Sequence, residues 1–209
     1  MRSDSSQYVS GWKTADDWAT AKERLTANPS VNDWSQVFKD FFETRLALRY
    51  LQPIQLLQEH GTLQGEGFSI AAIQCSLIEF LESTLQGVTY HCLRKGETLK
   101  PYEYSSSSEL FRNFLTTRAP FAAQFTNEVA VDFYVNVRCA LLHEASTKGD
   151  WRIWAGNCGG KIIDATQKIF YRNNFQDALL KFVADYGGAL PVNLDYQTAF
   201  IRKFDDLCQ

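Results

Sequence analysis

The sequence predicts a mainly α-helical domain that carries a small β-hairpin. Apolar residues recur at helical spacing through most of the chain, and capping residues with Gly or Pro breakers mark where helices begin and end. Only the stretch 151–171 changes to strand-like alternation. Because 45% of the 209 residues are hydrophobic and 14% are aromatic, the chain can bury a sizeable core. We expect one structural domain.

The first expected elements are an N-terminal arm over residues 1–30 and a long helix. Thr14 is placed to cap a short helix in the arm, which ends before Pro29. The long helix is expected over residues 32–51, with Pro53 kinking or restarting it. Its aromatic residues recur at helical spacing, which indicates a core face more often than a surface for stacking bases. These residues are Trp34, Phe38, Phe41 and Phe42.

The strongest periodicity predicts a helix over Phe68–Gln86, with Gly87 placed to end it. Glu79 and Glu82 lie three residues apart on this helix. A solvated face is the commoner explanation of such a pair, and the alternative makes Glu79 the partner of a buried arginine.

Residues 88–108 lose the helical period and predict a long loop, after which Ser108 is placed to cap a helix over 109–117. His91 and Cys92 in this loop are adjacent, a spacing that rarely serves one metal ion. The five cysteines of the chain are widely spaced and form no CxxC pair. We therefore expect no metal, no cofactor and no disulfide framework.

The most unusual stretch is Asn127–Gly149, whose first residue is placed to cap a helix and whose last is placed to end it. Its apolar residues cover nearly the whole circumference, so we expect this helix to pack on several sides. Arg138, Cys139 and His143 stand inside it. Burying an Arg or His unpaired costs roughly several kcal/mol, so each should have a partner, a ligand or an opening to water.

Residues 150–172 then change period. The alternation in WRIWA and the glycine-rich turn GNCGG predict a small β-hairpin or a three-stranded flap. Residues 173–209 predict two covering helices, over 174–186 and 194–207, which the breaker GGALP separates.

The segment Arg138-Cys-Ala-Leu-Leu-His143 has an R-x4-H spacing on a helix, and it resembles the signature of the HEPN superfamily. The likeness covers roughly residues 31–149, and FYVNVRCALLHEASTKGDWRI is most similar to prokaryotic Apea-like HEPN proteins associated with defence. Active members are metal-independent ribonucleases, so the resemblance implies catalytic roles for Arg138 and His143. The chain departs from the pattern at Cys139, where active members carry Asn, Asp or His. Asn136, one turn earlier, is the candidate substitute for that polar group.

Five residues on an α-helix span about 140° of rotation, so Arg138 and His143 do not share a face of one helix. If two copies of the helix pack about a two-fold axis, each Arg138 can meet the other copy's His143. We therefore expect a homodimer through the 127–148 helix. Arg138 would hold the scissile phosphate of RNA and His143 would take the proton of a ribose 2′-hydroxyl, leaving a 2′,3′-cyclic phosphate and a 5′-hydroxyl.

Five residues after the motif could extend such a site along RNA. Lys148, Arg152 and Lys161 would follow the backbone, and Trp151 and Trp154 would stack an unpaired base. A solvated and packed hairpin is the alternative explanation for all five. The net charge of -3 argues against a protein that coats nucleic acid through bulk charge, but it allows a local basic patch.

Other functions stay open. A non-catalytic RNA- or nucleotide-binding HEPN module, or a dimerisation domain, accounts for the same motif. A thiol enzyme built on Cys139 and His143 is the weakest alternative, because no orienting acid stands at a known spacing. The sequence has no apolar signal core and no run of about 18 consecutive apolar residues, so we expect a cytoplasmic protein without a membrane partner.

Overall fold

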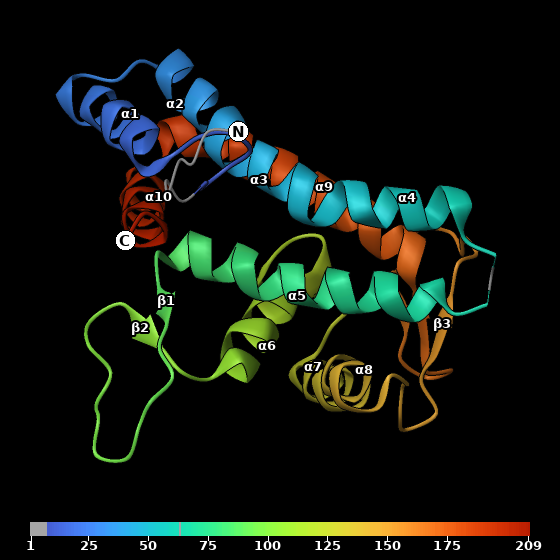
Figure 1. Ribbon diagram of the computed structural model, residues 1–209. Helices are drawn as coiled ribbons and strands as arrows, with labels where there is room; N and C mark the ends of the chain where they lie inside the picture. Colours follow the sequence, from blue (N-terminus) through green and yellow to red (C-terminus); the bar gives the residue numbers. More distant parts are fainter. Residues whose placement is uncertain (1–7, 63) are drawn as a thin grey trace, which may run out of the picture. The chain divides into compact units, whose positions relative to one another are not determined.

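The computed structural model describes residues 8–62 and 64–209, and Figure 1 shows that helices dominate it. Helices hold 65% of the residues and strands hold 7%, which confirms the predicted mainly α class. The larger helices are α1 (Ala15–Ala27), α2 (Val31–Val37), α4 (Gln52–His60), α5 (Glu66–Gln86), α6 (Ser107–Thr117), α7 (Asn127–Phe133), α8 (Ala140–Glu144), α9 (Arg172–Ala189) and α10 (Leu194–Leu207). The strands are β1 (Thr89–Tyr90), β2 (Glu103–Tyr104), β3 (Arg152–Trp154), β4 (Ile163–Asp164) and β5 (Ile169–Tyr171).

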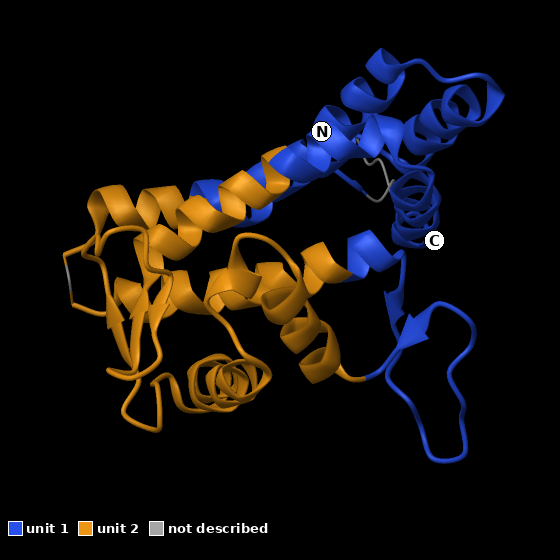
Figure 2. Cartoon of the chain, turned by 180° about the vertical axis from the view of Figure 1, so that it is seen from behind, with its two compact units in different colours: residues 1–52, 83–105, 185–209 blue, residues 53–82, 106–184 orange. Residues whose placement is uncertain are grey.

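The chain divides into two compact units, each made of separate stretches of sequence (Figure 2). Unit 1 comprises residues 1–52, 83–105 and 185–209, and unit 2 comprises residues 53–82 and 106–184. The R-x4-H motif and the three-stranded sheet both belong to unit 2. The expected subdivision at residues 30, 149 and 172 stays a prediction.

Unit 1 is built on aromatic side chains from α1, α10 and the helix that starts with α2. The Phe38 ring lies 5.0 Å from the ring of Phe42 and 5.6 Å from that of Tyr186. Trp18 is 2% exposed, and its indole Nε1 donates a hydrogen bond of 2.9 Å to Asp205. The aromatic stripe of the long helix is therefore core, as its spacing predicted.

The long helix begins one residue earlier than expected and does not stop at Pro53. Ser30 caps α2 in a reciprocal capping box with Asp33. Winding then alternates between π and α through Phe38–Glu43 (η1), Thr44–Leu46 (α3) and Ala47–Leu51 (η2) until α4 begins. Pro53 is the second residue of α4, and the helix continues past it to His60 without a break.

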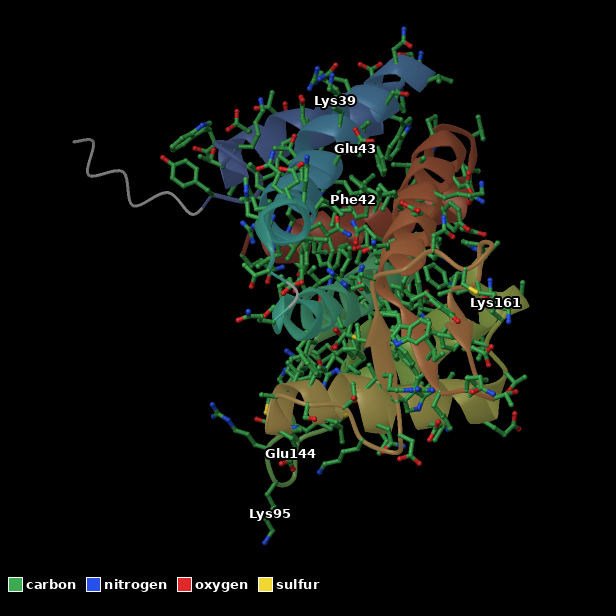
Figure 3. All side chains as sticks on the ribbon, turned by 90° about the vertical axis from the view of Figure 1, so that its right-hand side faces the viewer. Lys39, Phe42, Glu43, Lys95, Glu144 and Lys161 are labelled. Atoms are coloured by element: carbon green, nitrogen blue, oxygen red, sulfur yellow. The ribbon has the colours of Figure 1, made fainter. Side chains whose placement is uncertain are left out.

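Helix α5 matches its prediction closely and passes through the middle of unit 2. In Figures 1 and 3 its unit 2 part lies between α4 and the helix formed by α7 and α8. Gly87 follows it with φ +61°, and a Cβ there would stand 2.6 Å from the carbonyl oxygen of Ala199. Of the described helices, only α5 is long and apolar enough to cross a membrane, and 61% of that apolar stretch is buried. A core helix of a soluble protein has the same two properties.

The sheet of unit 2 has the strand order β3-β5-β4, which is the three-stranded form of the prediction, and it includes a hairpin formed by β4 and β5. Strand β3 pairs in parallel with β5, and β4 pairs with β5 in the antiparallel sense. A parallel pair needs a connection that returns the chain to the same end, and residues 155–168 provide it. The loop expected over residues 88–108 also contains a short parallel pair, β1 with β2.

Candidate functional site

The helix that carries the R-x4-H motif consists of α7, a π-helical segment η4 (Tyr134–Cys139) and α8. Thr126, rather than Asn127, caps it by accepting a hydrogen bond of 3.3 Å from the Val129 N–H. The helix ends at Glu144 because Ala145 adopts a left-handed conformation with φ +52°. The expected end at Gly149 is therefore several residues too late. We call Asn127–Glu144 the motif helix.

One face of the motif helix is buried in unit 2 and another is open. The buried face consists of Ala130, Phe133, Val137, Ala140 and Leu141. Val131, Val135 and Leu142 are 38%, 53% and 55% exposed, and they recur four and seven residues apart on one side. We call these three residues the exposed stripe. The sequence predicted a helix packed on several sides, and the single chain covers only part of its circumference.

Arg138 lies in line with the exposed stripe and is held from two sides. Its Nη2 stands 3.3 Å from the Glu79 Oε2, and its guanidinium lies 5.4 Å from the centre of the Tyr134 ring. The Arg138 and Glu79 side chains are 18% and 20% exposed. The Tyr134 hydroxyl is hydrogen-bonded to the Ser107 Oγ at 2.9 Å, and burial raises the pKa of Tyr134. Of the two explanations for Glu79, the ion pair with an arginine is therefore the correct one.

The other predicted surface acid on α5 behaves differently. The Glu82 side chain is fully buried, and it accepts hydrogen bonds from Arg118 Nε at 2.9 Å and Arg118 Nη2 at 2.8 Å. Asn113 Nδ2 donates a third at 2.5 Å. A solvated face is thus the wrong explanation for both glutamates, because each meets an arginine from a neighbouring helical segment or loop.

His143 is exposed at the end of the motif helix, one turn beyond Cys139. Across residues 8–62 and 64–209, its imidazole has no hydrogen-bond partner, and the neighbouring Glu144 instead accepts from Lys148 Nζ at 2.9 Å. Cys139 is half-buried. The nearby Cys75 thiol is buried, which raises its pKa to about 12 and makes it a poor nucleophile. Of Arg138, Cys139 and His143, only His143 has an exposed side chain.

Asp132 joins the motif helix to the sheet. Its carboxylate accepts hydrogen bonds of 2.8 Å from Asn136 Nδ2 and from Trp151 Nε1, and a further one from Lys168 Nζ. Partial burial acts to raise the pKa of Asp132, but these three donors outweigh burial and lower the pKa below its ordinary value. Asn136, predicted to support the motif, therefore donates to Asp132.

The predicted aromatic contacts to RNA divide into one exposed ring and one buried ring. Trp151 is 3% exposed and its indole N–H is bonded to Asp132, so it cannot stack a base and that prediction is wrong. Trp151 immediately precedes β3, and its polar partner is 19 residues away in sequence. Trp154 is 48% exposed and meets Tyr171 edge-on, with ring centres 6.2 Å apart.

The predicted basic contacts do not gather into one patch. Lys161 pairs with Asp164 at 3.2 Å, and Arg152 Nη2 donates to the Gln167 carbonyl oxygen at 3.0 Å. Figure 3 shows Lys161 projecting from a part of unit 2 distant from Glu144, the partner of Lys148. The exposed cations are therefore tied to local acceptors rather than aligned beside His143.

Arg172 lies in no sequence motif, yet it opens α9 and is only 5% exposed. It lines a cavity of about 370 Å³ with Gly65–Phe68 and residues 153–156. An arginine directly after an apolar strand is a weak signal, because its burial depends on α5 and β3 meeting in space.

No protein-family model matches the sequence, and the chain has no significant similarity to a curated protein or to a solved structure. The resemblance to HEPN proteins therefore stays a prediction that rests on the R-x4-H motif. In the described part of the chain, no three His, Cys, Asp or Glu side chains lie close enough together to hold a metal ion.

Proposed function

We propose that the protein is a HEPN-type, metal-independent endoribonuclease that acts as a homodimer through the motif helix. The observation that carries the proposal is the placement of the motif. Arg138 pairs with Glu79 on the line of the exposed stripe, and His143 is exposed at the end of the helix, directly after Leu142 and about 140° around the helix from Arg138. A cation and an open proton acceptor thus border an apolar surface that the single chain leaves uncovered.

The chemistry follows from these two groups. The guanidinium of Arg138 binds the non-bridging oxygens of the scissile phosphate and offsets the charge that develops on them. His143 accepts the proton of the adjacent ribose 2′-hydroxyl, whose oxygen attacks the phosphorus and expels the 5′-oxygen of the next nucleotide. The products are a 2′,3′-cyclic phosphate and a 5′-hydroxyl, and DNA is not a substrate because it lacks the 2′-hydroxyl.

A second copy of the chain is the expected cover of the exposed stripe. Pairing two motif helices about a two-fold axis would bury Val131, Val135 and Leu142 of each copy. It would also bring Arg138 of one copy toward His143 of the other. Sedimentation velocity tests this: the wild type should be dimeric and Val135→Asp monomeric. The control Val192→Asp alters a valine that is 76% exposed elsewhere and should leave the dimer intact.

A non-catalytic dimerisation or RNA-binding module is the second candidate. The pairing of Arg138 with Glu79 favours it, because a phosphate would have to compete with a carboxylate 3.3 Å from the guanidinium. Cys139 also favours it, since a thiol is a weaker hydrogen-bonding group than the Asn, Asp or His of active HEPN proteins. This candidate predicts a dimer without turnover.

RNA cleavage in excess EDTA separates the two candidates. Wild-type protein should cut mixed RNA and leave DNA intact, with cyclic phosphate ends on the products. His143→Ala and Arg138→Lys should both be inactive, the second because lysine lacks the two-pronged donor geometry of arginine. The matched control is His60→Ala, which removes an exposed histidine of α4. Cleavage that survives in His143→Ala, or that His60→Ala also abolishes, contradicts the proposed site.

A further inference from the structure

Unit 2 contains a cavity that the motif does not use. It has a volume of about 370 Å³ and lies where the start of α5, strand β3 and the first residue of α9 meet. Small-molecule sites in proteins begin at about 300 Å³, so the cavity can accept a ligand the size of a nucleotide. Its walls combine one buried cation, a helix N-terminus, three glycines and two exposed aromatic rings, and each of these limits the chemistry of the ligand.

The buried cation is Arg172, whose side chain is only 6% exposed. Its Nη1 is buried without a hydrogen-bond partner in the described part of the chain. Its Nη2 lies 3.5 Å from the Glu66 Oε1, which is longer than the usual charge-assisted hydrogen bond. A guanidinium has five N–H donors, and leaving them unmatched in a buried position is unfavourable. The arginine therefore has unused capacity for an anion.

The N-terminus of α5 adds to the attraction for an anion. This 21-residue helix begins at Glu66, and the unpaired N–H groups of a helix start carry partial positive charge. Gly65 has φ +142°, and Gly67 brings backbone close to the guanidinium, since a Cβ there would lie 3.7 Å from Arg172 Nε. The Glu66 carboxylate, whose Oε2 accepts from the Gln64 N–H at 3.1 Å, also lines the cavity and opposes this attraction, so a phosphate has to share Arg172 with it.

The aromatic walls are Phe68 and Trp154, which are 40% and 48% exposed. Large apolar rings that line a cavity and remain open to solvent offer flat faces to a planar ligand. Stacking of a nucleobase on such rings contributes roughly 1–3 kcal/mol and tolerates any base. Gly156 at the rim has nothing within 4 Å of the position of a Cβ, so the cavity is not obstructed there.

We propose that this cavity binds a nucleoside phosphate, with the phosphate at Arg172 and the α5 N-terminus and the base on Trp154 and Phe68. The ligand is either a free nucleotide or one nucleotide of an RNA strand, since both present the same phosphate and base. The cavity is a second site, and its assignment does not depend on Arg138, His143 or RNA cleavage.

Titration of the full chain with nucleoside 5′-monophosphates, monitored by isothermal calorimetry, tests the assignment. A monophosphate should bind saturably, while the matching nucleoside and inorganic phosphate alone should each bind at least about tenfold more weakly, because each keeps only half of the contacts. A short single-stranded RNA distinguishes the two sources. Binding of RNA without binding of the monophosphate identifies the ligand as a nucleotide within a strand.

Variants decide whether binding occurs in this cavity. Arg172→Gln should weaken binding about tenfold or more, and Trp154→Ala, an exposed position that folding tolerates, should weaken it at least several-fold. Arg24→Gln is the control, because it removes an exposed arginine of α1 outside the cavity lining. His143→Ala should bind like the wild type even where RNA cleavage is lost. Absence of saturable binding by both monophosphate and RNA overturns the proposal, as does an unchanged affinity in Trp154→Ala.

Discussion

Two adjacent glycines in α9 predict stability changes of opposite sign. Gly187 and Gly188 both lie inside the helix, where replacing glycine by alanine normally stabilises a protein by roughly 0.5–1 kcal/mol. A Cβ on Gly188 meets nothing within 4 Å, so Gly188→Ala should give that full gain. A Cβ on Gly187 would stand 2.6 Å from Phe38 Cε1 and 3.0 Å from Phe38 Cζ. Gly187→Ala therefore forces the Phe38 ring to move.

That movement is costly because Phe38 is 4% exposed and its ring is hemmed in by Phe42 and Tyr186. Adding a methyl group to a core of this kind costs roughly 1–3 kcal/mol. Subtracting the gain in helix propensity leaves Gly187→Ala between neutral and about 2 kcal/mol destabilising. The difference between the two variants isolates the steric term at about 1–3 kcal/mol, since the propensity gain is common to both.

Urea denaturation followed by circular dichroism measures this difference from the two midpoints, given equal slopes. Besides Gly188→Ala, the control is the double variant Phe38→Leu with Gly187→Ala. The smaller leucine side chain should relieve the clash, so the alanine should lower the free energy of unfolding less than it does beside Phe38. The reasoning is refuted if Gly187→Ala is as stable as Gly188→Ala, or if its cost is the same in the Phe38→Leu background.

Four further changes probe unit 2. Arg118→Met should cost about 3–5 kcal/mol because it removes the cation paired with the buried Glu82 carboxylate, whereas Lys148→Ala breaks an exposed pair and should leave the free energy of unfolding nearly unchanged, both by urea denaturation. Trp151→Phe should cost about 1 kcal/mol through its lost hydrogen bond to Asp132, measured in the same way. The pKa of Asp132 in the folded protein lies below its ordinary value of 3.8, so the ionised Asp132 stabilises the fold. Relative to Asp132→Asn, this stabilisation should be full at neutral pH and should disappear as the pH falls through the folded pKa. Denaturation curves of both proteins at pH 7 and pH 3 measure the change.

The helices could be predicted where local signals decide them. The Thr14 capping box and the periodic stretch ending at Gly87 both lie within a few residues of what they control, and both are correct. GGALP was expected to end a helix after residue 186, yet α9 continues to Ala189. Glycine is a poor helix former in isolation, but here Gly187 is what permits the helix to approach Phe38, a residue about 150 positions earlier. Tertiary contact overrides propensity at that point.

The strands and the ligand-binding features depend on contacts that no local pattern contains. The residues of β3 alternate as a strand should, but whether they pair with β4 or β5 is determined by how the 155–168 connection crosses the sheet. As an aromatic residue, Trp151 was predicted to stack an unpaired base. Its indole N–H is instead hydrogen-bonded to the Asp132 carboxylate, and the ring is buried. Arg172 lies in no sequence motif. It lines the cavity because three segments that are separate in the sequence meet around it. In each case the deciding partner is distant in sequence.

The motif helix shows why apolar residues around a whole helix need not mean that one chain buries all of its sides. A helix with apolar residues on all sides can be buried within one chain, or it can carry two separate faces for two different neighbours. Here the face of Phe133 and Val137 is buried within unit 2, while Val131, Val135 and Leu142 remain outside. Neither face is wide, but together they cover most of the helix and reproduce the pattern seen in the sequence. The uncovered half lies on the line of Arg138, so the surface that a second copy would cover and the surface that a phosphate would approach are one and the same. The monomeric Val135→Asp variant should therefore lose RNA cleavage along with the dimer, although it keeps Arg138 and His143 unchanged.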